Sequence, residues 1–204
     1  MLRRTVLAAL GAFGLAAATF APVAMAQQDQ QIDRISDYLN SLDTLKGDFV
    51  QIEADGLISE GEFFMRRPGR LLFRYTRPDR RSVISDGFWV AVVDTRENSI
   101  DRFPLSETPL KLLLAEDVDL GAEKAITKVE ESRGQLRVTA VDPGNEAQGS
   151  ITMVFDANPL ALKQWITVDG QGLKTTIALR GVSSNVELEN ELFRIPRREG
   201  DFRD

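Results

Sequence analysis

The sequence predicts a mainly β domain, with one antiparallel sheet of about ten strands and short helices that cover its concave face. From Lys46 onward, apolar and polar residues alternate with a period of two. Turn sequences, among them Asp55-Gly56 and Asp86-Gly87, break this alternation about every eight to twelve residues, which is typical of an antiparallel meander. A sheet of this size tends to curl, so we expect the helices to lie across its hollow side.

The alternation predicts strands in both halves of the chain. In the first half they cover residues 46–53, 57–65, 70–77, 81–86 and 88–94. In the second half they cover residues 125–131, 135–141, 150–156, 162–168 and 173–180. A final segment, residues 186–195, is predicted to be the last strand of the sheet. Segment 88–94 is apolar on both faces, so the pattern does not assign its inward side.

Two segments have helical patterns. The apolar stripe of the first is formed by Ile32, Ile35, Leu39 and Leu42, at spacings of three, four and three. Thr108-Pro109 predicts the start of the second helix, with Thr108 as N-cap and Pro109 as the first residue. Its apolar residues are Leu110, Leu112, Leu113 and Leu114. A further short helix is possible at residues 120–124. Taken alone, the apolar stripe of the first segment is best explained by an ordinary helix packed on a core.

The first 26 residues have the three parts of an export signal. Arg3 and Arg4 provide a positive start, and an uncharged apolar run follows from Val6 to Phe20. Ala24-Met25-Ala26 then gives the small-x-small pattern that signal peptidase accepts. The run is shorter than the roughly 18 to 20 residues that cross a bilayer, which favours a cleaved signal. We predict a signal peptide over residues 1–26, Sec export and one mature domain over residues 27–204.

The amino-acid composition excludes several kinds of catalytic and metal site. The chain has no cysteine and no histidine, which excludes disulfides, lipid anchors on cysteine, His-dependent nucleophile systems and the usual His-based metal sites. The formal charge is −6, or −8 without Arg3 and Arg4, which argues against nucleic acid as a partner. A carboxylate enzyme is an alternative, but Asp86, Asp94 and Asp101 lie near strand ends, where acidic residues mostly form turns. We expect no enzymatic activity, metal or cofactor.

Several blocks together resemble the LolA family of periplasmic carriers, which move lipoproteins to the outer membrane. The blocks are Phe49-Val50-Gln51, Gly61-Glu62-Phe63-Phe64-Met65-Arg66-Arg67-Pro68-Gly69, Phe73 with Tyr75, Pro78, Ser85-Asp86-Gly87 and the Thr108-Pro109 helix. The resemblance covers nearly the whole mature chain, and the Arg-Pro-Gly block with the later Asp-Gly turn is its most specific part. The chain departs from the family at its end, where only Pro196 stands in place of a frequent Pro-Pro pair.

The resemblance implies an unclosed antiparallel β-barrel of about ten or eleven strands, whose hydrophobic cavity is lidded by helices. In the family, an Arg just before the Pro of this block holds the lid by hydrogen bonds, and Arg67 has that position here. A guanidinium near an apolar cavity needs carbonyl partners, because burying it without them is costly. The alternative is that Arg67 is a surface charge in a turn, like Arg66 and Arg70.

The cavity wall is predicted from strand alternation. If Arg67 points inward, Phe63 and Met65 share its face, and Leu71, Phe73 and Tyr75 form the matching apolar face after the turn. We expect these five residues to bind acyl chains, although the same face could be plain core. The expected lid residues are Ile32, Ile35, Leu39, Leu110, Leu113 and Leu114.

The resemblance implies a periplasmic chaperone or carrier that binds the acyl chains of lipoproteins released from the inner membrane and delivers them to the outer membrane. The implied partners are acylated lipoproteins, an inner-membrane lipoprotein-releasing ABC transporter and an outer-membrane acceptor or receptor. We expect the carrier to be a monomer. The alternative is a LolA-like protein that binds or senses lipids or glycolipids of the cell envelope, but such relatives usually carry an extra domain or a lipid anchor.

Overall fold

The computed structural model describes residues 21–78, 80–121, 125–144 and 146–196, with side chains from Gln28 onward. Most of the predicted signal peptide, residues 1–20, lies outside the described residues. The helix α1 begins at Ala21 and ends at Asn40. Among the described residues, no helix has both the length and the apolar character needed to cross a membrane.

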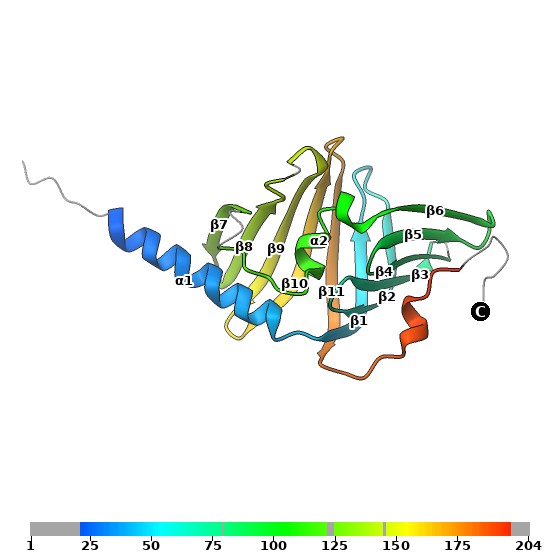
Figure 1. Cartoon of the computed structure of the whole chain (residues 1–204), viewed down its shortest axis with the longest axis horizontal. Coiled ribbons are helices and arrows are strands. Elements are labelled where there is room, and N and C mark those ends of the chain that lie inside the picture. Colours follow the sequence, from blue (N-terminus) through cyan, green and yellow to red (C-terminus); the bar gives the residue numbers. More distant parts are fainter. Residues whose placement is uncertain (1–20, 79, 122–124, 145, 197–204) are drawn as a thin grey trace, which may run out of the picture.

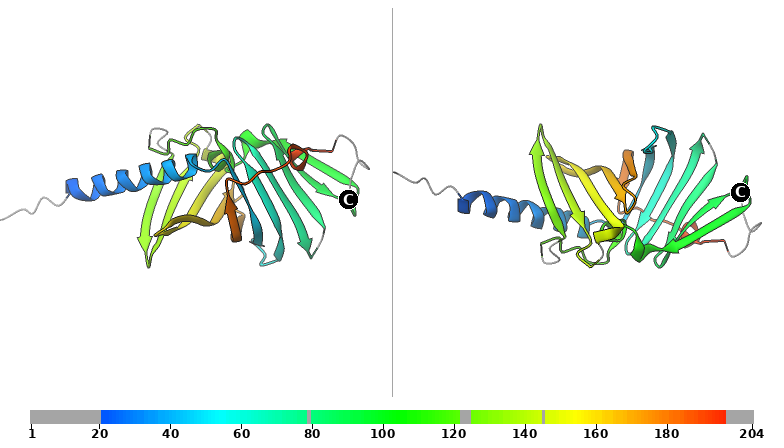
Figure 2. Two further views of the ribbon diagram at one scale, coloured as in Figure 1. Left: turned by 90° about the horizontal axis from the view of Figure 1, so that it is seen from below. Right: turned by 90° about the horizontal axis from the view of Figure 1, so that it is seen from above.

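The described residues form one sheet of eleven antiparallel strands, which confirms the predicted fold class. Strands β1 to β6 are Thr44–Ile52, Ile58–Arg66, Arg70–Arg77, Arg81–Asp86, Trp89–Asp94 and Ser99–Pro104. Strands β7 to β11 are Ile126–Ser132, Gln135–Val141, Gly149–Ala157, Leu160–Asp169 and Lys174–Ser184. Every neighbouring pair is consecutive in sequence except β1 and β11. The order begins with β6 and ends with β7, so the sheet stays open (Figure 1). Figure 2 shows two wings, β2–β6 and β7–β10, that meet at β1 and β11.

Two predictions about the strands are wrong. The sequence pattern missed β6, because Ser99–Pro104 is a largely exposed edge strand whose charged residues and proline hide the alternation. The predicted strand at residues 186–195 does not form. Instead, a short 3₁₀ helix, η3, covers Asn190–Phe193, and the segment around it lies against the sheet without joining its ladder.

The second predicted helix is shorter than expected. Helix α2 covers only Lys111–Leu114, and its N-cap is Leu110, not Thr108. The Thr108 hydroxyl donates instead to the carbonyl of Leu105, at the start of the 3₁₀ helix η1, Leu105–Glu107. Another 3₁₀ helix, η2, covers Glu146–Gln148. Residues 122–124 of the possible third helix lie outside the described residues.

Apolar side chains pack on both faces of the sheet. The inner face, which carries α1 and α2, holds the larger cluster and includes Leu71, Phe73 and Tyr75. The outer face holds a smaller cluster that includes Leu72 and Phe193. Alternation along each strand produces the two faces. It also resolves the strand that the sequence left unassigned: Val90 joins the inner cluster, whereas Ala91 and Val93 join the outer one.

The segment after β11 is attached to the outer face. Phe193 is 3% exposed and lies under the guanidinium of Arg66, whose central carbon is 5.2 Å from the ring centroid. Arg66 also donates to the carbonyl of Leu188 and to the side chain of Asn190. The apolar residues of this segment therefore cover the outer face instead of extending the sheet.

Replacing Phe193 by alanine should destabilise the fold by about 3 kcal/mol, because it empties a buried aromatic site. Phe88→Ala is the matched control, since Phe88 is 80% exposed. That change should shift the free energy of unfolding by no more than about 0.5 kcal/mol. Urea unfolding followed by circular dichroism measures both. Equal losses in the two variants would show that the segment is not packed as described.

Gly69 occupies the turn between β2 and β3 with φ of +73°, and a Cβ there would lie 2.6 Å from the Cα of Gly87. Gly134 has φ of +76° but open space around it. Gly134→Ala should cost about 1 kcal/mol from left-handed strain alone. Gly69→Ala should cost about 2 kcal/mol more, because the backbone of the β4–β5 turn must also move. Denaturant midpoints of the pair test this difference, and similar midpoints would contradict it.

Candidate functional site: a lidded apolar interior

Aromatic side chains form the floor of the inner face. The ring of Phe49 lies edge-on to Phe73 at 4.6 Å and to Tyr75 at 5.0 Å, measured between centroids. Phe73 also contacts Trp165 of β10 at 5.9 Å. These residues come from β1, β3 and β10, so the floor spans the junction of the two wings. Gly61 allows this packing, since a Cβ there would lie 2.0 Å from the carbonyl oxygen of Arg74 and 2.9 Å from the Phe49 ring.

The structure brings the predicted wall and lid residues together in one buried cluster. The wall residues in it are Phe63, Met65, Leu71, Phe73 and Tyr75. The lid residues in it are Ile32, Ile35 and Leu39 of α1 and Leu113 and Leu114 of α2, while the half-buried Leu110 packs against its margin. The strand alternation therefore predicted this face correctly on both sides of the Pro68-Gly69 turn. A role of these residues in acyl binding stays a prediction.

Arg67 lies where the two lid segments meet. Its Nη1 donates to the carbonyl of Leu39, and its Nη2 donates to the side chain of Asn40 at 3.1 Å. On the other side, its Nε and Nη2 donate to the carbonyl of Ala115 at 2.9 and 2.6 Å. A longer contact of 3.4 Å reaches the carbonyl of Glu116. One guanidinium thus connects the end of α1 to the segment after α2.

The surroundings of Arg67 differ from those of its neighbours. Desolvation lowers the pKa of the Arg67 guanidinium from its ordinary value, while the charges of Asp117 and Asp43 oppose this effect. Arg66 and Arg70, by contrast, both reach Asn190 in the segment on the outer face. The three arginines are similar in sequence, but only Arg67 contacts the lid.

Further hydrogen bonds hold the lid in place around Arg67. The Asn40 side chain accepts from the amide of Val118 at 2.9 Å and donates to its carbonyl at 3.0 Å. The amide of Gly69 donates to the carbonyl of Leu114 at 2.8 Å. The last turn of α1, the end of α2 and the β2–β3 turn therefore form one hydrogen-bonded unit.

Other contacts attach the lid to the second wing. Arg34 of α1 donates to the carbonyl of Ala157 at 2.7 Å, and the hydroxyl of Tyr38 accepts from the amide of Leu162 at 3.0 Å. Lys111 of α2 forms an ion pair with Asp142, and this hydrogen bond lowers the pKa of the Asp142 carboxyl. The lid thus contacts both wings, and Arg67 provides its main side-chain attachment to the first.

A polar cluster lies at the other end of the inner face. The Tyr75 hydroxyl donates to the Gln51 side chain at 2.6 Å, and Gln51 donates to Glu53 at 3.0 Å. Arg81 pairs with Glu53 at 2.6 Å and stacks on the Tyr75 ring. Burial raises the pKa of the Tyr75 hydroxyl to about 12. The residues predicted for the site do not include Gln51 or Arg81, although Gln51 follows Phe49 at strand spacing and so belongs to the same face.

The composition of the site suits the binding of an apolar ligand. Its interior is aromatic and aliphatic, and its polar groups are paired with one another. The part of the chain that the structure describes contains no group of three or more acidic side chains placed to hold a metal ion. The site is therefore a covered apolar interior, with the Arg67 hydrogen bonds at one end and the polar cluster around Tyr75 at the other.

Comparisons with known proteins give the family. A model described as "Outer membrane lipoprotein carrier protein LolA" matches residues 40–196. An outer-membrane lipoprotein carrier protein from Halorhodospira halophila is 28% identical over 182 residues, 85% of each chain. One from Methylococcus capsulatus is 27% identical over 169 residues, 78% of this chain and 80% of that one.

A solved structure supports the fold alone. It is a DUF1329 family protein from Desulfovibrio piger with a TM-score of 0.50 and 11% identity, covering 82% of this chain and 96% of that one. The family assignment rests instead on the match to residues 40–196, which spans well over half of the chain and confirms the resemblance seen in its motifs. The chain belongs to the LolA family of outer membrane lipoprotein carrier proteins.

Proposed function

We propose that this protein binds the acyl chains of lipoproteins in its lidded interior and carries them through the periplasm from the inner to the outer membrane. The observation that carries the proposal is the set of Arg67 hydrogen bonds that closes two helical segments over an aromatic floor. The names of the relatives, outer-membrane lipoprotein carrier proteins, support the same role. The proposal assigns the chain no catalytic step.

The size of the hydrophobic effect explains why a carrier is needed. Each buried methylene contributes about 0.8 kcal/mol, so one C16 chain resists transfer into water by roughly 12 kcal/mol. A lipoprotein with several such chains does not cross an aqueous compartment at a useful rate unaided. Its carrier must shield the chains and still release them to the next acceptor.

A lid held by hydrogen bonds meets both requirements. In the closed state, the guanidinium of Arg67 is paired and the apolar floor is covered. Opening breaks these bonds and exposes apolar surface to water at a cost of about 25 cal/mol per Å². Bound acyl chains cover that surface again and so remove this cost. Release restores the Arg67 hydrogen bonds, so closure of the lid favours departure of the ligand. The proposed donors and acceptors of cargo are an inner-membrane releasing transporter and an outer-membrane acceptor.

Arg67→Leu should tighten acyl binding and slow release. The leucine keeps the apolar bulk but removes every donor, so the closed, empty state loses hydrogen bonds to a charged group worth about 1.5 to 3 kcal/mol each. In the liganded state these hydrogen bonds are already broken, so the substitution does not destabilise it in the same way. We expect an affinity for a palmitoylated peptide at least about tenfold higher, and correspondingly slower transfer to outer-membrane vesicles.

The control for this variant is Arg70→Leu, because Arg70 contacts Asn190 on the outer face and not the lid. It should bind and release the peptide as the parent does. Arg67→Lys should fall between the parent and Arg67→Leu, since an ammonium cannot reproduce the planar fork. Parental release from Arg67→Leu would remove Arg67 from the mechanism.

The proposed location has its own test. Export followed by cleavage after Ala26 should yield a periplasmic protein that begins at Gln27. N-terminal sequencing or intact-mass analysis of osmotic-shock fractions measures this. Recovery of a form that retains residues 1–26 would contradict both the location and the carrier role.

A further inference from the structure

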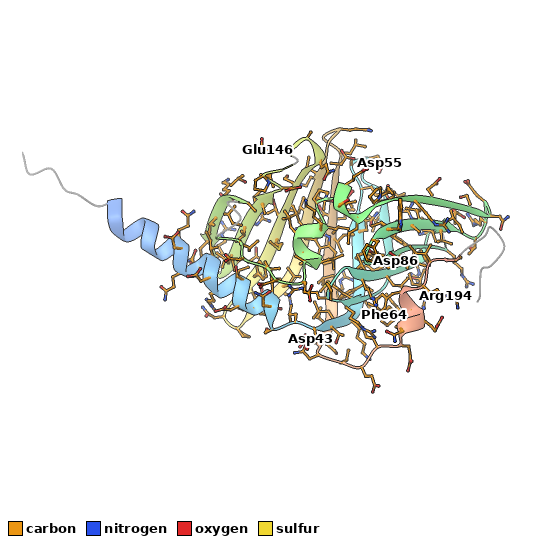
Figure 3. The ribbon with its side chains drawn as sticks, in the orientation of Figure 1. Asp43, Asp55, Phe64, Asp86, Glu146 and Arg194 are labelled. Atoms are coloured by element: carbon orange, nitrogen blue, oxygen red, sulfur yellow. The ribbon has the colours of Figure 1, made fainter. Side chains whose placement is uncertain are left out.

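The inner face changes character along its strands. Near the lid it is apolar, with Phe63 and Leu71 in the buried cluster. Toward the β1–β2 turn, positions on the same face carry Gln51, Tyr75 and Arg81. Figure 3 labels Asp43 and Asp55 at opposite ends of β1, and these mark the two ends of the face.

Each end of this face has its own polar group. Arg67 lies beside Asp43, to whose carbonyl its amide donates at 2.9 Å, whereas Glu53 lies two residues from Asp55. From Gly69 to Tyr75, strand β3 spans about 20 Å at the rise of an extended chain. An amphiphile that lies along the strands therefore has the lid at one end and the polar cluster at the other.

The cluster is buried on one side and reaches solvent on the other. Gln51 and Tyr75 are buried, whereas the side chains of Arg81 and Glu53 are 30% and 29% exposed. The Tyr75 hydroxyl donates its one hydrogen to the Gln51 oxygen, whereas the Gln51 amide nitrogen has a second hydrogen beside the one donated to Glu53. The opposite charges of Arg81 and Glu53 compensate each other at 2.6 Å. The cluster thus combines buried donors with little net charge, which suits a neutral acceptor better than an anion.

We propose that Gln51 and Arg81 donate to the carbonyl oxygen of an acyl ester or amide, while the Tyr75 hydroxyl holds the Gln51 amide in place. The hydrocarbon then runs along the apolar floor toward Arg67, and the rest of the ligand leaves past Arg81 into solvent. This inference rests on the proposed acyl-carrier function and adds an orientation and a selectivity to it. A carbonyl placed at the other end would compete with the backbone carbonyls that already occupy Arg67.

The test compares two neutral peptides that differ in one group. One carries an O-palmitoyl serine, whose ester has the carbonyl, and the other carries an O-hexadecyl serine, whose ether lacks it. The parent should bind the ester about three- to tenfold more tightly, the range expected for one net hydrogen bond. Tyr75→Phe should remove most of this preference, because the Gln51 amide loses the hydrogen bond that holds it, so ester binding should weaken more than ether binding.

The matched control is Tyr38→Phe, which removes the other tyrosine hydroxyl of the chain, at the α1–β10 contact. It should keep the preference for the ester. A second variant, Arg81→Gln, should weaken ester binding more than ether binding. Circular dichroism and unfolding midpoints establish that each variant is folded before binding is measured.

The outcomes separate this inference from the carrier function. Equal binding of ester and ether by the parent, or equal losses of both in Tyr75→Phe, would overturn the carbonyl site and leave acyl binding intact. Palmitate anion bound more tightly than the ester, with the gain lost in Arg81→Gln, would also overturn it, because the site would then recognise a carboxylate. A parent that binds neither peptide would contradict the carrier function itself.

Discussion

One guanidinium fixes the position of the lid. Helix α1 runs for twenty residues and has no basic residue in its last turn, so its C-terminal carbonyls lack a positive partner from the helix itself. Arg67, which directly follows β2, supplies that charge where the helix dipole is negative. The planar fork also contacts Ala115, so the two lid segments share one set of donors. Either segment can leave only if part of that set loses its acceptors.

The alternation of side chains along each strand gives the sheet two separate uses. The inner face holds the lid and the aromatic floor, whereas the outer face is covered by the segment around Phe193. Successive side chains point to opposite faces, so the neighbours Arg66 and Arg67 contact the outer segment and the lid, respectively. A one-residue change of register would exchange the two faces. This division keeps the lid independent of the chain that closes the outer surface.

Much of this arrangement was predictable from the residues. Period-two alternation located ten of the strands and assigned Phe63, Met65 and Phe73 to one face, because half-buried strands leave a strong pattern. It failed for β6, an exposed edge, and for residues 186–195, whose apolar side chains pack without a pairing partner. Arg67 could be distinguished from Arg66 and Arg70 only through the family resemblance. Arg81 gave no signal, since its partners Glu53 and Tyr75 come together only in the folded sheet.

The pairing of β1 with β11 has a consequence for folding. Strand β1 uses its first edge for β2, which follows directly, but its second edge for Lys174–Ser184 near the other end of the chain. When the N-terminal part of the chain is available to fold first, the β1–β6 meander can form early, while the second edge of β1 is still unpaired. Contacts of such long range form slowly, and an unpaired edge is a template for other strands. The free edge of β1 in the nascent protein must therefore be protected from pairing with other strands until β11 has formed.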